Sequence, residues 1–155
     1  MYKIMTAGPT QVRENVRLER SKEFTNPDID PKFFDFYRET CELLSKAMHT
    51  DTKAFILRGE GILGLEAACA SLTEEGDRVL VIDNGIFGKG FADFVSMYGG
   101  EPVLFSSDYR NPVNVDKLRD FLLKDSDFKY ATVVHCDTPS GVMNDVESIS
   151  KLFDE

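Results

Sequence analysis

Residues 78–89 read RVLVIDNGIFGK, and this stretch decides the fold. It follows the turn formers Glu75-Gly76-Asp77, and residues 78–82 form an apolar run typical of a buried strand. Polar residues and Gly85 end that run, and a helical pattern then extends from about residue 87 to residue 98, before Gly99-Gly100. A strand that passes directly into a helix predicts one unit of an α/β protein.

The same alternation continues on both sides of this unit. Further strands are predicted at residues 54–57, 102–105 and 130–134. Helices are predicted at residues 62–72 and after the capping residues Asn114 and Asp145. Strands joined through helices pair in parallel and are covered on both faces. The sequence therefore predicts a three-layer α/β fold with a mostly parallel sheet.

Two segments are expected along the chain. Residues 1–30 contain Gly8-Pro9 and Asn26-Pro27-Asp28, so this segment is predicted to be an extended arm without regular elements. Asp30-Pro31 begins an amphipathic helix, and residues 31–155 are predicted to form part of one domain. The last helix reaches Asp154-Glu155 with no capping glycine and no following strand. We therefore expect this domain to be truncated at its carboxyl end.

Composition and charge exclude several classes of protein. With 42% hydrophobic residues among 155, the chain can bury a core. A formal charge of −9 argues against nucleic acid as a partner. The three cysteines are far apart and predict neither a disulfide framework nor a metal site. No apolar run has signal-peptide or membrane-spanning length, so we expect a cytoplasmic protein with no membrane partner.

Turns that follow predicted strands are the candidate binding sites, because ligands of open parallel sheets collect beyond the carboxyl ends of the strands. The first is Arg58-Gly59-Glu60-Gly61-Ile62, which opens a helix. Backbone N–H groups and the helix dipole at such a turn suit an anion such as phosphate. Two alternatives stay open: the glycines serve only close packing, or the turn belongs to a nucleotide-binding module.

The second turn carries Phe87 between Gly85 and Gly88. Flanking glycines let a flat ligand approach the ring, so Phe87 is a candidate stacking residue. The alternative is that Phe87 covers the core beside Phe91 and Phe94 at the start of its helix.

The third turn is the polar cluster His135-Cys136-Asp137-Thr138-Pro139-Ser140-Gly141, which ends an apolar strand. Its hydroxyl and carboxyl groups are expected to face the same crevice. His135, Asp137 and Ser140 are also the residue types of a hydrolytic triad. Triad members must converge in space, and residues this close on one extended segment are not expected to converge, so the triad is not expected.

Taken together and in order, four motifs resemble the class V pyridoxal-phosphate-dependent aminotransferases, of the alanine:glyoxylate and serine:pyruvate type. The resemblance covers nearly the whole chain, and it implies the amino-terminal part of the large domain of a fold-type I PLP enzyme. Its motifs are Thr6-Ala7-Gly8-Pro9-Thr10, Gly59-Glu60-Gly61 leading to Leu65-Glu66-Ala67-Ala68, Asn84-Gly85-Ile86-Phe87-Gly88, and His135-Cys136-Asp137-Thr138-Pro139-Ser140-Gly141.

The resemblance implies a role for five residues in binding pyridoxal 5'-phosphate. Glu60, Gly61 and Ile62 match the loop that cradles the cofactor phosphate. Phe87 matches the aromatic residue that stacks on the pyridine ring, and Thr138 matches the residue beside the phenolic oxygen. The sequence departs from the family pattern at Glu60, where a small hydroxyl residue is usual, and at Phe87, where tryptophan is common.

An activity is also implied by this resemblance. The parent protein is expected to be a homodimeric aminotransferase that moves an amino group from an amino acid of the alanine or serine type to glyoxylate or pyruvate. A 2-aminoethylphosphonate:pyruvate transaminase is the alternative within the class, and a non-catalytic α/β binding domain is the alternative outside it. The lysine that holds the cofactor as a Schiff base lies downstream in the family, so no catalytic residue is assigned in this chain.

Overall fold

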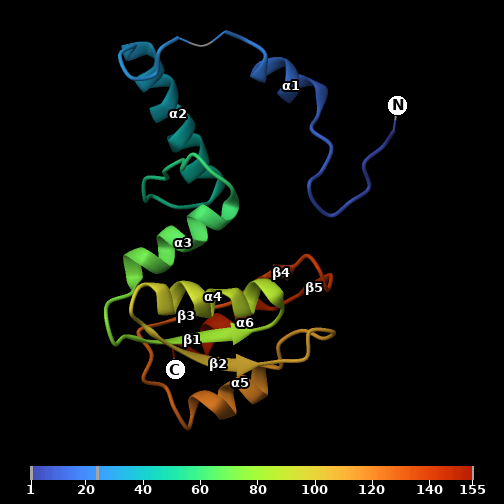
Figure 1. Ribbon diagram of the computed structural model, residues 1–155, viewed down its shortest axis with the longest axis vertical. Helices are drawn as coiled ribbons and strands as arrows, with labels where there is room; N and C mark the ends of the chain where they lie inside the picture. The colour runs from blue at the N-terminus through green and yellow to red at the C-terminus, as the bar shows by residue number, and fades with distance from the viewer. Residues whose placement is uncertain (1, 24, 155) are drawn as a thin grey trace. The chain divides into compact units, whose positions relative to one another are not determined.

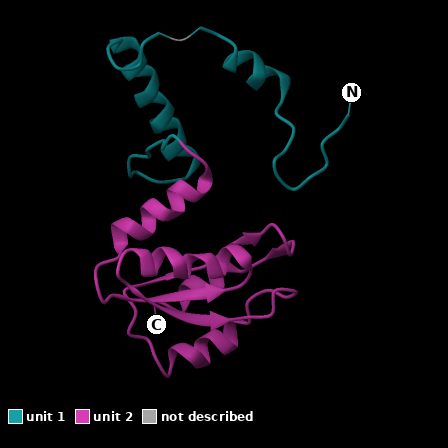
Figure 2. Ribbon diagram, viewed as in Figure 1, with its two compact units in different colours: residues 1–58 teal, residues 59–155 magenta. Residues whose placement is uncertain are grey.

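The computed structural model describes residues 2–23 and 25–154. The expected ends of the chain at Met1 and Glu155, and Phe24 within the predicted arm, lie outside the described residues. The chain divides into two compact units, the first ending at Arg58 and the second beginning at Gly59 (Figure 2).

The described residues of the first unit form two helices. α1 spans Glu14–Arg20 and α2 spans Pro31–Ala47. The expectation that no regular element precedes Asp30 is therefore wrong. α1 carries Glu14 in its first turn and basic residues in its last, an arrangement that complements the helix dipole. The start of α2 is as predicted, because the Asp30 carboxylate accepts a hydrogen bond from the Lys32 N–H at 2.9 Å.

Residues 54–57 form no strand, contrary to the sequence prediction. Side chains of α2 bind this segment's backbone instead. The Tyr37 hydroxyl accepts from the Ile56 N–H at 3.2 Å and donates to the Ile56 carbonyl at 3.3 Å. The Ser45 hydroxyl accepts from the Ala54 N–H at 3.0 Å. Apolar residues predicted a strand here, but the backbone polar groups are satisfied by hydroxyls.

The second unit is built on a three-stranded parallel sheet in the order β2-β1-β3. β1 spans Arg78–Asp83, β2 spans Glu101–Ser106 and β3 spans Tyr130–Thr132. β1 is the central strand, and its residues from Val79 to Asp83 are all buried. The predicted parallel sheet is confirmed, with RVLVID as its centre.

Helices cover both faces of this sheet, so the three-layer arrangement is also confirmed (Figure 1). Val79 and Val81 face a core shared with α3 (Gly61–Leu72) and α4 (Ile86–Met97). Leu80 and Ile82 face the opposite core, shared with α5 (Val115–Leu122) and α6 (Val146–Lys151). Successive side chains of a strand point to opposite faces, which explains why one apolar run serves two cores.

The segment after β3 differs from its prediction. The strand expected to reach residue 134 ends at Thr132, and a short antiparallel hairpin follows, formed by β4 (Cys136–Asp137) and β5 (Val142–Met143). The Val134 carbonyl accepts side-chain N–H groups from Asn84 at 2.7 Å and Asn144 at 2.9 Å. The side-chain amides of Asn84 and Asn144 take the place of a strand partner at this carbonyl. The apolar pattern of the sequence could not predict these two hydrogen bonds.

Candidate cofactor site

The first predicted site is the amino-terminal end of α3. Glu60 is the N-cap residue, and its side chain makes no capping hydrogen bond. Gly61 begins the helix, and a Cβ at this position would meet no atom within 4 Å. A Cβ on Gly59, in contrast, would lie 2.6 Å from Leu63 Cδ2. Gly59 therefore lies against the Leu63 side chain, whereas Gly61 leaves open space beside the first N–H groups of a twelve-residue helix.

The second predicted site is the turn from β1 into α4. Phe87 is the second residue of α4, and its side chain is 51% exposed. The alternative of a core role beside Phe91 and Phe94 does not hold, because those two rings pack edge-to-face at 6.2 Å within a core cluster that Phe87 does not join. An exposed aromatic face is therefore available at the carboxyl edge of the central strand.

The third predicted site is the turn between β4 and β5. Thr138 is exposed, whereas Asp137 is buried. The Asp137 Oδ2 accepts the Ser140 N–H at 3.1 Å, and the Asp137 carbonyl accepts the Gly141 N–H at 2.9 Å. His135 is exposed on the strand side of this turn. His135 and Asp137 therefore differ in burial.

The second and third turns are in direct contact. A Cβ on Gly85 would lie 2.6 Å from the Cγ of Asp137, so the Asp137 carboxyl packs against the Gly85 backbone. Phe87 and Thr138 thus stand on adjoining turns at one end of the sheet. At the other end of α4, the hydroxyl of its C-cap residue Tyr98 donates a hydrogen bond to Glu66 Oε1 of α3 at 2.9 Å.

A polar cluster that was not predicted from the sequence lies beside this site, centred on Asp83. The Tyr109 hydroxyl donates to Asp83 Oδ1 at 2.5 Å, and the Ser106 hydroxyl donates to Oδ2 at 3.1 Å. The hydrogen bond to Asp83 raises the pKa of Tyr109 above its usual value, because the bond favours the protonated phenol. Ser106 is the last residue of β2 and Asp83 is the last residue of β1. Two polar residues at the carboxyl ends of neighbouring strands were the sequence feature that could have predicted this cluster.

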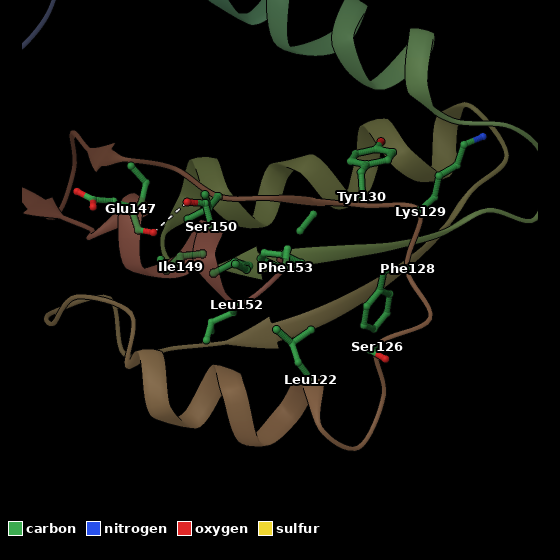
Figure 3. Close-up of a pocket in the computed structure, with 14 residues that line it drawn as sticks. Leu122, Ser126, Phe128, Lys129, Tyr130, Glu147, Ile149, Ser150, Leu152 and Phe153 are labelled. Carbon is green, nitrogen blue, oxygen red and sulfur yellow. Dashed lines mark hydrogen bonds between the residues drawn. The ribbon is translucent and has the colours of Figure 1, made fainter. Parts of the chain in front are cut away.

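A separate groove of about 810 Å³ lies along β3, and Figure 3 shows side chains from α6 and from the segment before β3 around it. None of Glu60, Gly61, Ile62, Phe87 and Thr138 lines this groove. Among the described strands, β3 pairs only with β1, so the groove follows its other edge. It is a feature of the sheet edge rather than of the candidate site.

Residues 2–23 and 25–154 contain neither a membrane-spanning helix nor a cluster suited to a metal ion. No helix there is long and apolar enough to cross a lipid bilayer. No group of three or more His, Cys, Asp or Glu residues in the described ranges is placed to hold a metal ion.

Comparison with known proteins identifies relatives over nearly the whole chain, although no family model matches it. The chain is 34% identical over 148 residues to a pyridoxamine–pyruvate transaminase of Mesorhizobium japonicum, covering 96% of this chain and 37% of the relative. It is 25% identical over 152 residues to a 2-aminoethylphosphonate–pyruvate transaminase of Lysinibacillus sphaericus, covering 97% of this chain and 42% of the relative.

A solved structure gives the same result for the fold. The crystal structure of pyridoxamine–pyruvate aminotransferase from Mesorhizobium loti matches with a TM-score of 0.92 and 31% identity, over 99% of this chain and 39% of that one. The chain thus spans only 37% and 42% of the length of the two curated relatives described above. Sequence and fold agree over that span, and the homologues of this chain are class V pyridoxal-phosphate-dependent aminotransferases.

Proposed function

We propose that this chain forms the cofactor-binding part of an aminotransferase that transfers an amino group from an amino acid of the alanine or serine type to pyruvate or glyoxylate. One observation carries the proposal: an exposed aromatic ring, Phe87, and an exposed hydroxyl, Thr138, lie on adjoining turns at the carboxyl edge of the sheet. Pyruvate is named in both curated relatives, which supports it as the amino-group acceptor.

The residues present fit pyridoxal 5'-phosphate. Gly61 and Ile62 would present backbone N–H groups at the α3 terminus to the phosphate, and the open space at Gly61 allows its approach. Phe87 would stack on the pyridine ring, and the Thr138 hydroxyl would donate to the phenolic oxygen. Glu60 would lie beside the phosphate as the N-cap residue. When bound, the cofactor supplies an electron sink, while the chain orients it.

The substrate pair and the assembly are part of the same proposal. A 2-aminoethylphosphonate donor is the second candidate, supported by the 25% identical relative. We also propose a cytoplasmic homodimer in which residues 1–30 act as an arm and residues 31–155 belong to the large domain. Exposed apolar side chains on α3 support burial against a second copy, and they include Ile62, Leu65 and Leu72.

Replacing Phe87 with alanine should weaken cofactor binding about tenfold, because the variant loses the stacking face. The measurement is the dissociation constant of 4'-deoxypyridoxine 5'-phosphate for the intact protein. This probe has the ring and phosphate but no aldehyde, so it cannot react with surface lysines.

The matched control for this variant is Phe153→Ala, which removes a ring that is 45% exposed, lies outside the site and should leave probe affinity unchanged. Phe87→Trp keeps an aromatic face and should bind at least as tightly as the parent. Equal affinities for Phe87→Ala and the parent protein would count against the stacking role.

Replacing Glu60 with serine should instead tighten probe binding, by roughly threefold at low salt. The change removes a carboxylate from the phosphate end of α3 and supplies a hydroxyl that suits the N-cap position. The increase in affinity should become smaller as the salt concentration rises, because salt screens the repulsion between the Glu60 carboxylate and the phosphate. Glu74→Ser, at an exposed position after the other end of α3, is the control. Weaker binding by Glu60→Ser would show that the carboxylate contributes to the site.

A further inference from the structure

The Asp137 carboxyl is almost fully buried, although one of its two oxygens has no hydrogen-bond partner in the described parts of the chain. The Asp137 side chain is 1% exposed, and among the described residues its carboxylate accepts one hydrogen bond, from the Ser140 N–H to Oδ2 at 3.1 Å. The Oδ1 atom is buried and has no hydrogen-bond partner. A buried oxygen without a partner is unfavourable, so some other feature of the fold holds the carboxyl in place.

That feature is the turn before α4. A Cβ on Gly85 would lie 2.6 Å from Asp137 Cγ, 2.6 Å from Oδ1 and 2.8 Å from Oδ2. The carboxyl therefore fills the place that a side chain at residue 85 would occupy. Gly85 has φ of 153° and ψ of 178°, a conformation open essentially to glycine alone. Gly85 is also the N-cap of α4 and stands two residues before Phe87.

Asp137 also makes hydrogen bonds within its own hairpin turn. Its carbonyl accepts from Gly141, its Oδ2 accepts from Ser140, and Thr138 is the next residue in the chain. One side chain therefore contacts both of the turns that carry the candidate ring-binding and hydroxyl residues.

We propose that Asp137 is a positioning residue that sets the spacing between the Phe87 turn and the Thr138 turn. Its effect on the cofactor rests on the proposed function, whereas the coupling of the two turns does not. The competing explanation is local: Asp137 serves only to close its own turn, as Asp145 does at the start of α6. Asp145 likewise accepts from the N–H three residues on, Ser148, at 3.0 Å.

Three substitutions separate these explanations. Asp137→Ala removes both the acceptor for the Ser140 N–H and the carboxyl that packs against Gly85. Asp137→Ser keeps a short oxygen acceptor for the turn but lacks the carboxyl that fills the space at Gly85. Asp137→Asn keeps both shape and acceptor. Asp145→Ala is the matched control, because it removes an equivalent turn acceptor elsewhere in the same unit.

Hydrogen exchange of the Lys89 amide reports on the distant turn without any ligand. This N–H donates to the Gly85 carbonyl at 2.9 Å and makes no bond to Asp137. We expect its exchange to accelerate about tenfold in Asp137→Ala and Asp137→Ser, and to change little in Asp137→Asn and Asp145→Ala. Unchanged Lys89 exchange in Asp137→Ser would overturn the coupling, and this variant decides the matter even if Asp137→Ala does not fold.

Affinity for 4'-deoxypyridoxine 5'-phosphate is measured on the same variants of the intact protein. We expect Asp137→Ser to bind about tenfold more weakly and Asp137→Asn to bind as the parent does. If the parent binds the probe while Lys89 exchange does not respond, the inference is wrong and the proposed function stands. If Lys89 responds while the parent does not bind the probe, the coupling is confirmed and the proposed function is wrong for this chain.

Discussion

Replacing Leu80 with alanine should lower the free energy of unfolding by about 2–5 kcal/mol. Leu80 is fully buried at the centre of β1, with Val103 and Ala131 as its neighbours on the two flanking strands. Its side chain belongs to the core shared with α5 and α6. Truncation removes the apolar contact and leaves a cavity that a strand bonded on both sides cannot close.

Urea denaturation followed by far-ultraviolet circular dichroism measures this loss, and the midpoint should fall while the slope with urea stays the same. Leu123→Ala is the control. The Leu123 side chain is 79% exposed, so its removal should change stability by less than about 0.5 kcal/mol. Similar midpoints for Leu80→Ala and Leu123→Ala would contradict the assignment of β1 as the centre of the core.

Replacing Gly88 with alanine should destabilise the protein by about 1–3 kcal/mol, despite its place inside a helix. A Cβ there would lie 2.2 Å from the Asn84 Oδ1 and 2.9 Å from the Ile82 carbonyl oxygen. The carbonyl belongs to β1, and the Asn84 side chain is held by its bond to the Val134 carbonyl at 2.7 Å. Neither neighbour can move without disturbing the turn that presents Phe87.

Gly90→Ala provides an internal comparison two residues along the same helix. A Cβ on Gly90 would meet nothing within 4 Å. Alanine is the better helix former by about 1 kcal/mol, so this variant should be more stable than the parent. Thermal unfolding of the two variants should therefore shift in opposite directions. A shift in the same direction for both would show that helix propensity, rather than the close approach of α4 to β1, governs position 88.

Local patterns predicted much of the second unit because each signal lay within a few residues. The apolar run of β1 and the helix after Gly85 are present as expected. Asn114 and Asp145 cap their helices through the N–H groups of Lys117 at 2.9 Å and Ser148 at 3.0 Å. These features depend on side-chain periodicity and on hydrogen bonds three residues apart.

The two errors in strand prediction arose where distant side chains satisfy the backbone. The segment at residues 54–57 has strand-like composition, but the Tyr37 and Ser45 hydroxyls take its polar groups. The strand after Tyr130 stops early because Asn84 and Asn144 occupy the Val134 carbonyl. The partners are separated by 9 to 50 residues in sequence, so no local pattern could show them.

The sequence by itself determined the α/β class, the central strand, and the three turns in which Gly61, Phe87 and Thr138 lie, because periodicity and turn chemistry are encoded locally. Only the tertiary structure decided that Phe87 is exposed rather than buried in the core, and that the turns of Phe87 and Thr138 touch through Gly85 and Asp137. It also brought Tyr109 to Asp83. These contacts depend on how parallel strands end side by side, and such proximity follows from packing across the whole sheet.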